Sequence, residues 1–414
     1  MAAAARKLRL VVVSPFLDKR HGTERRVVEW ISHLADTFEV HVYSQRVDDL
    51  NLSKITWHRI PKLPGPHLVN YLWWFAANRL ARVWDRRISG LCHDIVFSPG
   101  VNCLDPDVVS VHIVFAEYIH RNRAEMEFAR NPASSWPALL HRKLYYELIA
   151  FLERRLYTRR ELRLILIARR TEDELRRFYG RDEKFPILYV GLDHGIFNSA
   201  RRIAKRDAAR RGLNITEDDF VLLLIGNDWR NKGVMVILEA MKMLRDLPVR
   251  LLLVGRENVT EYRDIVEEHH LADRVHFLSP RPDVEFYYAA ADVYLGPSLE
   301  DTFAQPPAEA MACGLPVVVS SANGTSEIIT DGVDGFILKD PADSTSLSGM
   351  IRRLYVDQEF RAGMGMSAAE TTKQYTWERN GEDLLKIFQE ILQRKAGPPT
   401  RSGDQELCEA PGPR

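Results

Sequence analysis

Residues 293–319 read VYLGPSLEDTFAQPPAEAMACGLPVVV and contain one complete structural unit. A short apolar strand at 293–296 is followed by a loop, then by a helix with prolines at its start and a glycine at its end. A second apolar strand follows at 316–319. A strand, helix and strand in this order join neighbouring parallel strands. The stretch therefore predicts a doubly wound α/β domain.

The same alternation extends over most of the chain. Further strands are predicted in the second half at Phe220–Ile225, Arg250–Val254 and Val275–Leu278, with a helix at Gly233–Leu244. In the first half they are predicted at Leu8–Val13, Val40–Tyr43, Asp94–Ser98, Val108–Val114, Leu162–Ile167 and Phe185–Val190. Continuous apolar strands alternating with helices indicate parallel sheets covered on both faces. At 414 residues the chain is long enough for two such Rossmann-like domains.

Composition suggests where these domains begin and end. The basic, polar stretch 201–211 is interpreted as a linker, which gives domains at 1–200 and 205–374. Residues 396–414 are rich in Pro, Gly and charge without apolar periodicity, so a disordered tail is expected there. Such sheets bind ligands at the carboxyl ends of their strands, and two facing domains would create a cleft between those ends.

Composition also excludes several classes of protein. The chain is 45% hydrophobic and 28% charged, as in soluble globular proteins. Its longest nearly apolar stretch, 68–77, is about half of what a membrane-spanning helix needs. Basic residues at 6, 7 and 9 interrupt any signal-peptide core, so a cytoplasmic location is expected. The four cysteines lie far apart, with neither C-x-x-C nor zinc spacing, so no metal is expected.

The helix start after residue 304 is a candidate anion site. Free backbone N–H groups at a helix N-terminus suit a negatively charged ligand. Glu309, expected in the first turn of this helix, can accept two hydrogen bonds from a vicinal diol such as a ribose. The alternative is that Glu309 only complements the helix dipole.

These residues resemble the donor site of retaining nucleotide-sugar glycosyltransferases with the GT-B fold. This large family, glycosyltransferase family four or "glycosyl transferases group 1", includes bacterial cell-envelope hexosyltransferases. It has two carboxylates eight positions apart that flank Gly-Phe-Gly, and then Glu-Ala-Met-Ala-x-Gly. Here the carboxylates are Asp301 and Glu309, and the loop is Thr302–Ala304. The resemblance implies that Glu309 holds the ribose and that the sugar is held by Asp301 and the backbone of Phe303, Ala304 and Gln305.

A second matching element is GNDWRNKG at 226–233, between a strand and a helix. Lys232 at a helix start opposes the macrodipole, at a cost on the order of a few tenths of a kcal/mol, and a bound diphosphate would explain it. The family has Lys-Gly here and an Arg directly after the strand glycine, both on the donor diphosphate. Asn227 occupies that Arg position, and Arg230 is the expected substitute. This motif most resembles that of the family branch that glucosylates lipopolysaccharide core. The resemblance therefore implies UDP-glucose as the donor in preference to GDP-mannose. The alternative is that Lys232 and Arg230 are ordinary surface residues with no role in binding.

The first half contributes weaker matches. Residues 15–25, PFLDKRHGTER, resemble the family's first loop; there Gly22 allows a close backbone approach and Thr23 can cap the next helix. His112 lies where the family has a histidine that contacts the donor sugar, although a buried structural histidine is the alternative. Asp105-Pro-Asp107 imitates the metal signature of the other glycosyltransferase fold, but that fold has a single nucleotide-binding unit, so a loop end is preferred.

Three more stretches, at 191–193, 324–335 and 375–378, extend the resemblance, which runs from about residue 9 to residue 394. In the family the last helix, here 376–394, crosses back onto the first domain.

The resemblance implies a retaining, metal-independent hexosyltransferase in cell-envelope glycolipid or polysaccharide synthesis. Lys232 and Arg230 would stabilise charge on the leaving diphosphate, and His112 would orient the sugar. The nucleotide sugar is a co-substrate and no cofactor is expected. Two alternatives stay open: an epimerase or phosphorylase of the same fold, and a non-catalytic sugar-nucleotide binding protein. An NAD-dependent oxidoreductase is disfavoured because neither half has Gly-x-Gly-x-x-Gly after its first strand.

Charge distribution suggests a membrane partner. Residues 1–200 carry 31 Lys and Arg against 23 Asp and Glu, and the rest carry 26 against 34. Stretches 71–90 and 141–163 mix arginines with aromatic residues, and the first holds Arg79, Arg82, Arg86 and Arg87. Such helices can lie in the headgroup region of an anionic bilayer. We therefore expect peripheral contact with the inner face of the cytoplasmic membrane, a glycolipid acceptor and no nucleic acid partner.

Overall fold

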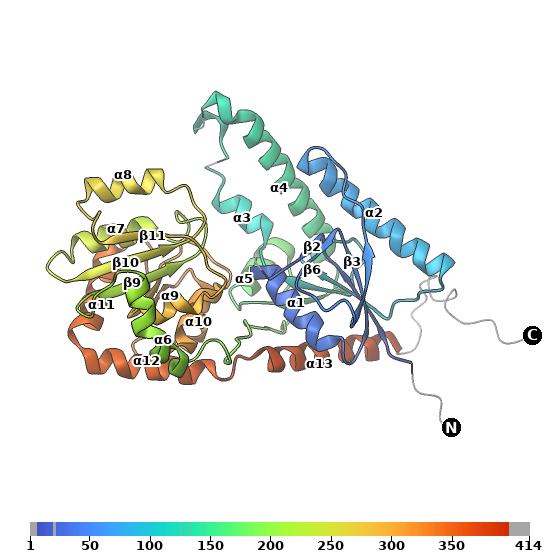
Figure 1. Ribbon diagram of the computed structural model, residues 1–414. Helices are drawn as coiled ribbons and strands as arrows, with labels where there is room; N and C mark the ends of the chain where they lie inside the picture. Colours follow the sequence, from blue (N-terminus) through green and yellow to red (C-terminus); the bar gives the residue numbers. More distant parts are fainter. Residues whose placement is uncertain (1–5, 20–21, 125, 131, 397–414) are drawn as a thin grey trace, which may run out of the picture. The chain divides into compact units, whose positions relative to one another are not determined.

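The computed structural model describes residues 6–19, 22–124, 126–130 and 132–396 (Figure 1). The chain divides into two compact units. Unit 1 contains the residues up to Leu188 and those from Glu378 onward, and unit 2 runs from Tyr189 to Trp377.

Unit 1 contains a six-stranded sheet with the order β5-β3-β1-β6-β7-β8, in which all neighbouring strands are parallel. Its first strand is fully buried from Leu10 to Val13, as expected for a parallel sheet covered on both faces. The strands are β1 (Arg9–Val13), β3 (Glu39–Ser44), β5 (Ile55–Arg59), β6 (Ile95–Pro99), β7 (Val108–Val111) and β8 (Arg163–Leu166), with a separate pair of β2 (Phe16–Leu17) and β4 (Arg46–Val47).

The helices of unit 1 pack on this sheet. The last helix returns to it, because the indole nitrogen of Trp30 donates to Asn380 Oδ1 at 2.7 Å and Phe388 packs against Phe97 with ring centroids 5.8 Å apart. The helices are α1 (Gly22–Leu34), α2 (His67–Ile88), α3 (Phe115–Arg121), α4 (Trp136–Tyr157), α5 (Thr171–Tyr179) and α13 (Trp377–Ala396), with short 3-10 turns η1 (Phe128–Arg130) and η2 (Ala133–Ser135).

Unit 2 contains a second six-stranded parallel sheet, with the order β11-β10-β9-β12-β13-β14. Its strands are β9 (Phe220–Ile225), β10 (Val249–Val254), β11 (Val275–Leu278), β12 (Val293–Gly296), β13 (Val317–Ser320) and β14 (Phe336–Leu338). Its helices are α6 (Ser199–Gly212), α7 (Val234–Lys242), α8 (Thr260–Glu268), α9 (Glu285–Ala290), α10 (Gln305–Ala312), α11 (Ser344–Val356) and α12 (Gln358–Thr372), with one 3-10 turn, η3 (Gly324–Ile328).

Both sheets have the same strand order counted along the chain, 3-2-1-4-5-6. In each, the direction in which strands are added reverses beside the first strand, between β1 and β6 in unit 1 and between β9 and β12 in unit 2. Doubly wound sheets bind ligands at the carboxyl ends of the strands at such a switch point. The α/β prediction of two Rossmann-like sheets is confirmed.

The structure corrects several sequence predictions. Residues 201–211 are not a linker but part of α6, because Arg206 and Arg210 both pair with Asp292 at the start of β12. Residues 189–200, assigned from sequence to the first domain, belong to unit 2. The strand predicted at 185–190 is reduced to a single bridge between Leu166 and Ile187, whereas β5 and β14 were not predicted.

The disordered tail predicted at 396–414 lies outside the described residues, except that Ala396 ends α13. In the described part of the chain, no helix combines the length and the apolar character that crossing a bilayer requires.

Candidate functional site

Three loops of unit 2 leave the carboxyl ends of β9, β12 and β13 and are hydrogen-bonded to one another. The backbone N–H of Leu299 donates to Asn231 O at 2.7 Å, and the Asn231 side chain donates to Glu300 O at 2.8 Å. The N–H of Asp301 donates to Ala322 O at 3.1 Å, in the loop after β13. The edge of the sheet at its switch point is therefore a connected surface of loop backbone.

Lys232 and Asp301 meet on this surface. The Lys232 ammonium forms an ion pair with the Asp301 carboxylate, and the two side chains are 23% and 17% exposed. Sequence reasoning found no structural partner for Lys232, but the folded chain provides one. The ion pair holds the ammonium at the carboxyl edge of the sheet, where a ligand's anionic group can reach it.

The turn that carries Lys232 is sterically constrained. Gly233 has φ 79°, and a Cβ atom there would lie 2.2 Å from the carbonyl oxygen of Pro297. Only glycine fits so close a backbone contact. The turn is also anchored by Trp229, which is buried and donates through Nε1 to Gly226 O at 2.9 Å.

The two other predicted residues of this turn are placed differently. Asn227 is exposed, and its Oδ1 accepts from the N–H of Arg256 at 2.9 Å. Arg230 is exposed directly after the buried Trp229. The side-chain amide of Asn227 therefore links the loops that follow β9 and β10, and Arg230 lies at the protein surface.

The start of α10 offers fewer donors than the sequence analysis assumed. Ala304 is its N-cap residue, and the next three residues are Gln305, Pro306 and Pro307, of which the two prolines have no N–H. The side chain of Gln305, however, has a buried Nε2 without a hydrogen-bond partner, and the Oγ of Ser298 is in the same state. Buried polar groups are nearly always paired, so both atoms are candidates for contact with a polar ligand.

The loop before α10 is anchored on its inner side. Phe303 is buried and packs against Tyr189 of the same unit, with ring centroids 5.7 Å apart. The carbonyl of Ala304 accepts from Thr325 Oγ1 at 2.6 Å. The loop backbone is therefore held in place without a ligand.

Glu309 lies one turn later than predicted. It is the fifth residue of α10, and its side chain is 5% exposed. The hydroxyl of Tyr288 donates to its Oε2 at 2.8 Å, and burial together with the Glu309 charge raises the pKa of Tyr288 well above its usual value. Because the helix dipole acts mainly within the first turn, dipole complementation explains this buried carboxylate poorly.

His112 follows β7 in unit 1 and is 8% exposed. Its Nε2 lies 3.0 Å from Ser110 Oγ. Burial, helped by the charge of Arg26, lowers the pKa of His112 to about 3. The imidazole is therefore neutral near pH 7.

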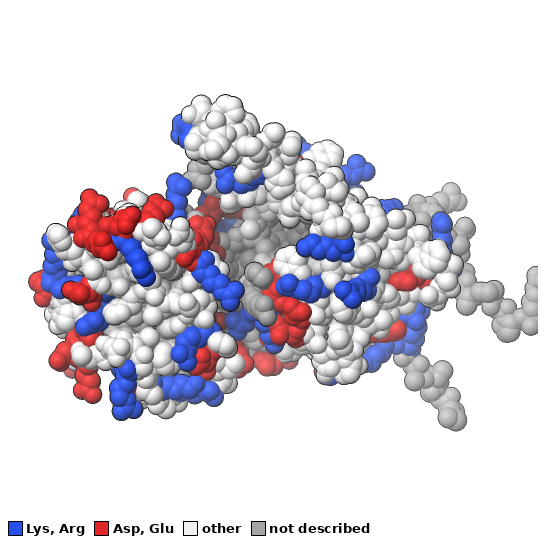
Figure 2. All heavy atoms as spheres, turned by 45° about the horizontal axis from the view of Figure 1, so that its top comes forward, with Lys and Arg blue, Asp and Glu red and all other residues white. Residues whose placement is uncertain are grey.

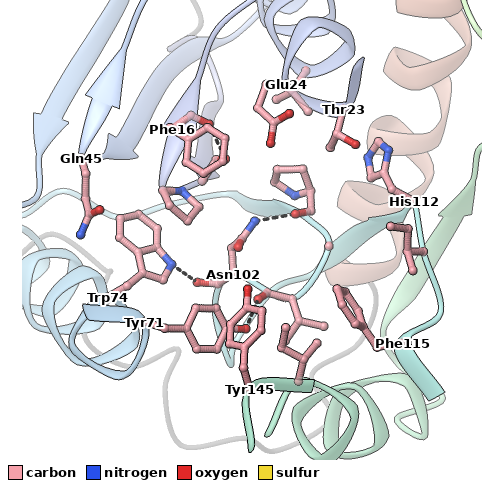
Figure 3. Close-up of a pocket in the computed structure, with 18 of the residues that line it drawn as sticks. Phe16, Thr23, Glu24, Gln45, Tyr71, Trp74, Asn102, His112, Phe115 and Tyr145 are labelled. Atoms are coloured by element: carbon pink, nitrogen blue, oxygen red, sulfur yellow. Dashed lines mark hydrogen bonds between the residues drawn. The ribbon is translucent and has the colours of Figure 1, made fainter. Parts of the chain in front are cut away.

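A cavity of about 390 Å³ lies within unit 1, at the carboxyl ends of β1, β6 and β7 (Figure 3). Thr23 and Glu24 reach it from α1, Tyr71 and Trp74 from α2, and Tyr145 from α4 (Figure 3). His112 also lines it. The cavity therefore occupies the switch point of the unit 1 sheet, where the topology favours ligand binding.

One prediction about unit 1 is corrected, and Asp105-Pro-Asp107 lies in a loop, as preferred from the sequence. Thr23 does not cap α1, because the helix already includes Gly22, which is exposed. The Asp105 and Asp107 carboxylates are used by the protein: Arg82 binds Asp105 through two hydrogen bonds of 3.0 and 2.6 Å, and Lys395 pairs with Asp107 at 2.7 Å. No cluster of His, Cys, Asp and Glu suited to a metal occurs among the described residues.

The predicted residues thus fall into two groups. Gly22 and His112 belong to unit 1, and the other eight belong to unit 2. Sequence reasoning missed Tyr288, whose only signal was its place in an apolar helix, and missed Thr325, because its bond to Ala304 depends on the fold. It also missed the cavity, whose lining residues are scattered between residues 14 and 157.

Comparison with known proteins finds a family match in unit 2. The family model described as Glycosyl transferases group 1 matches residues 205–371, within unit 2. The chain is 31% identical over 234 residues to a D-inositol 3-phosphate glycosyltransferase of Stackebrandtia nassauensis, covering 53% of this chain and 52% of that protein. It is 30% identical over 254 residues to the protein of the same name from Corynebacterium kroppenstedtii, covering 58% and 55%. The chain spans about half the length of these curated relatives.

Solved structures extend the similarity to the whole fold. WaaG, a glycosyltransferase involved in lipopolysaccharide biosynthesis, has a TM-score of 0.74 at 20% identity, covering 92% of this chain and 99% of that one. HepE from Anabaena, in complex with UDP and glucose, has a TM-score of 0.70 at 18% identity, covering 92% and 100%. The chain therefore has the GT-B fold and contains a glycosyl transferases group 1 domain at residues 205–371.

Proposed function

We propose that this protein is a retaining glycosyltransferase that moves a hexose from a nucleotide-diphosphate sugar to an acceptor hydroxyl without a metal ion. The donor binds at the loops of unit 2, and the acceptor binds in the cavity of unit 1. The observation that carries the proposal is the ion pair of Lys232 with Asp301 beside the start of α10. It places a cation, which can pair with a diphosphate, next to a carboxylate, which can accept hydrogen bonds from sugar hydroxyls.

Each group of this surface has a chemical task. When the bond between sugar and diphosphate breaks, negative charge builds on the leaving phosphate, and a preorganised cation stabilises that charge. Lys232 takes this role, with Arg230 as a second cation. Asp301 exchanges the Lys232 ammonium for sugar hydroxyls when the donor binds, and Glu309 receives the ribose diol.

The neutral state of His112 fits a positioning role. A neutral imidazole can donate through one nitrogen and accept through the other, so it can bind a sugar hydroxyl without attracting the diphosphate. Retention follows if the acceptor attacks from the face that the diphosphate leaves. Among donors we favour UDP-glucose, the molecule with which a HepE structure of the same fold forms a complex.

The proposal extends to a membrane-bound acceptor in cell-envelope synthesis. Apolar side chains along α2 are exposed, namely Leu72, Leu80, Trp84 and Ile88, and so are Leu140, Leu144 and Phe151 along α4. The surface over these helices is mainly uncharged, with scattered Lys and Arg (Figure 2). An apolar face with flanking cations supports docking on an anionic bilayer.

The prediction that Arg82 belongs to this surface is wrong. Arg82 is buried and bonded to Asn78 and Asp105. The arginines of α2 with exposed side chains are therefore Arg79 and Arg87, and Arg86 is half-buried.

The proposal can be tested by incubating the purified protein with a panel of nucleotide sugars and measuring release of the nucleotide diphosphate. A transferase should release the nucleotide diphosphate slowly by hydrolysis and faster when an acceptor is present. A binding protein should show affinity without release, and an epimerase should return a changed nucleotide sugar. Either of these two results would contradict the proposed activity.

A further inference from the structure

We propose that the unit 1 cavity takes an uncharged sugar ring, so that the acceptor hydroxyl belongs to a neutral glycosyl residue and not to a phosphorylated polyol. This inference rests on the proposed function and adds the chemical class of the acceptor. The relatives described above carry names that specify D-inositol 3-phosphate. The lining of this cavity differs from what that anion would need.

Aromatic rings form much of the cavity wall. The rings of Tyr71 and Tyr145 meet edge to face at 5.1 Å, and Phe16 is 40% exposed at the opposite side (Figure 3). The indole of Trp74 is fixed by a hydrogen bond from Nε1 to Asn102 O at 2.8 Å. Aromatic faces are electron-rich and attract the weakly positive C–H groups on the face of a pyranose ring. Flat, rigid walls of this kind suit a sugar.

Three side-chain amides, those of Gln45, Asn70 and Asn102, are among the polar groups of the wall. Gln45 donates to Asn70 Oδ1 at 3.4 Å, and Asn102 donates to Pro99 O at 2.5 Å. Amide side chains can both donate and accept, which matches hydroxyl groups that do both. Polar groups in small number on an aromatic wall are typical of sites that orient a ligand by its hydroxyls.

The charges of the wall oppose an anion. Among the described residues that line the cavity, Lys62 is the one Lys or Arg, whereas Glu24 and Glu153 contribute carboxyl groups. Glu24 points into the cavity from α1 (Figure 3). Burial, then the charges of His141 and Lys62, lower the pKa of His67, so this imidazole adds no cation near pH 7. A phosphate would gain attraction from one exposed lysine and suffer repulsion from the Glu24 carboxylate.

Glu24 gives a neutral acceptor a specific partner instead. A carboxylate accepts hydrogen bonds from two neighbouring hydroxyls, as sugar rings present them. The buried Glu153 accepts from Tyr179 OH at 2.6 Å and from Phe115 N at 3.1 and 3.0 Å. Its hydrogen bonds are directed to the protein, whereas the Glu24 side chain points into the cavity (Figure 3), so we assign the contact with the acceptor to Glu24.

The full-length protein with UDP-glucose tests the acceptor class. The first arm offers uncharged methyl and p-nitrophenyl glycosides of glucose, galactose and mannose, and the second offers D-inositol 3-phosphate. We expect at least one glycoside to accelerate UDP release and to yield a disaccharide by mass spectrometry, with no transfer to inositol phosphate. Transfer to inositol phosphate, or donor hydrolysis that no glycoside accelerates, would overturn the inference. Absence of both UDP binding and UDP release would instead count against the proposed function.

Variants then locate the binding site. Gln45→Ala and Asn70→Ala should raise the KM for the glycoside about tenfold, the effect of one lost hydrogen bond of about 1.4 kcal/mol. Tyr145→Ala should raise KM more than Tyr145→Phe, which keeps the ring. Gln358→Ala removes an exposed amide from unit 2 and is the matched control. An unchanged KM in all three alanine variants of the cavity would place the acceptor elsewhere.

Discussion

The ammonium of Lys232 and the carboxylate of Asp301, 69 residues apart in the chain, form an ion pair between the loops that follow β9 and β12. Each side chain thereby holds the other in place before any substrate arrives. The pair also links the two sequence elements that most resemble a nucleotide-sugar site. The first prediction concerns its cation.

Lys232→Ala should lower kcat by two or more orders of magnitude, because the ammonium acts on charge that develops mainly in the transition state. Steady-state kinetics with donor and acceptor measure the effect, and circular dichroism checks the fold. Lys242→Ala, which removes a lysine paired with Glu239 on α7, is the matched control and should retain activity. A Lys232→Ala enzyme with a near-native rate would contradict the diphosphate assignment.

Glu309→Gln should weaken binding of the free nucleoside diphosphate about tenfold, since an amide offers one acceptor oxygen where the carboxylate offers two. Titration calorimetry measures the dissociation constant. Tyr288→Phe removes the hydroxyl that donates to Glu309 but keeps the carboxylate, so it should weaken binding less. If the wild-type and Glu309→Gln proteins bind the nucleoside diphosphate equally well, the role of Glu309 is structural.

Treatment with EDTA should leave the transfer rate unchanged, because side-chain cations take the place that Mg²⁺ has in metal-dependent transferases. The measurement compares UDP release before and after chelation and after adding Mn²⁺ or Mg²⁺. Inactivation that either ion reverses would show that the reaction needs a metal.

The protein should lose stability as the pH falls from about 6.5 towards 4. Burial lowers the pKa of His93 to about 4 and that of His112 to about 3, from 6.5. In this range the unfolded chain binds protons that the folded chain excludes, so acid favours unfolding. Urea titrations at pH 7.5, 6.5 and 5.5 measure the trend.

One buried group acts in the opposite direction. Burial raises the pKa of Glu153 from 4.5 to about 7, so its contribution to stability falls as the pH rises through that interval. Replacing His93 with Phe should flatten the acid loss of stability, and replacing Glu153 with Gln should steepen it. The same slope in all three proteins would show that other groups control the acid response.

Binding to liposomes should require anionic lipid, weaken with salt and decrease when Arg79, Arg86 and Arg87 are changed together to Ser. Each basic residue near such a surface contributes about 1 kcal/mol. Sedimentation with phosphatidylserine vesicles measures it. A triple change to Ser at Arg201, Arg211 and Arg263, exposed arginines of unit 2, is the control. If the wild-type protein ignores these vesicles at low salt, the acceptor is not presented by an anionic membrane.

The sequence predicted the central strands well but missed two edge strands, β5 and β14. Phe220–Ile225 and Val293–Gly296 have the predicted bounds, because continuous apolar runs between turns are typical of buried parallel strands. The edge strand β5, ITWHR, is only partly buried, so its pattern resembles a loop. In α6 the arginines suggested a solvated linker, because the partner of Arg210, Asp292, lies 82 residues away.

The candidate site was predictable only where it consists of contiguous residues. Loops 226–233 and 301–305 each contain a recognisable sequence motif, and both lie at the carboxyl edge of the unit 2 sheet. The pairing of Lys232 with Asp301 and that of Tyr288 with Glu309 depend on tertiary structure. The same holds for the cavity, to which Phe16, Tyr71 and Tyr145 come from separate elements.

The shared strand order of the two units bears on how the protein can change its specificity. Both sheets follow 3-2-1-4-5-6, so each unit has its own switch point at which a ligand can bind. On the proposed function, mutations in the unit 1 cavity can alter acceptor preference while the loops of unit 2 stay intact. Natural selection can then give the protein new acceptors and preserve its donor.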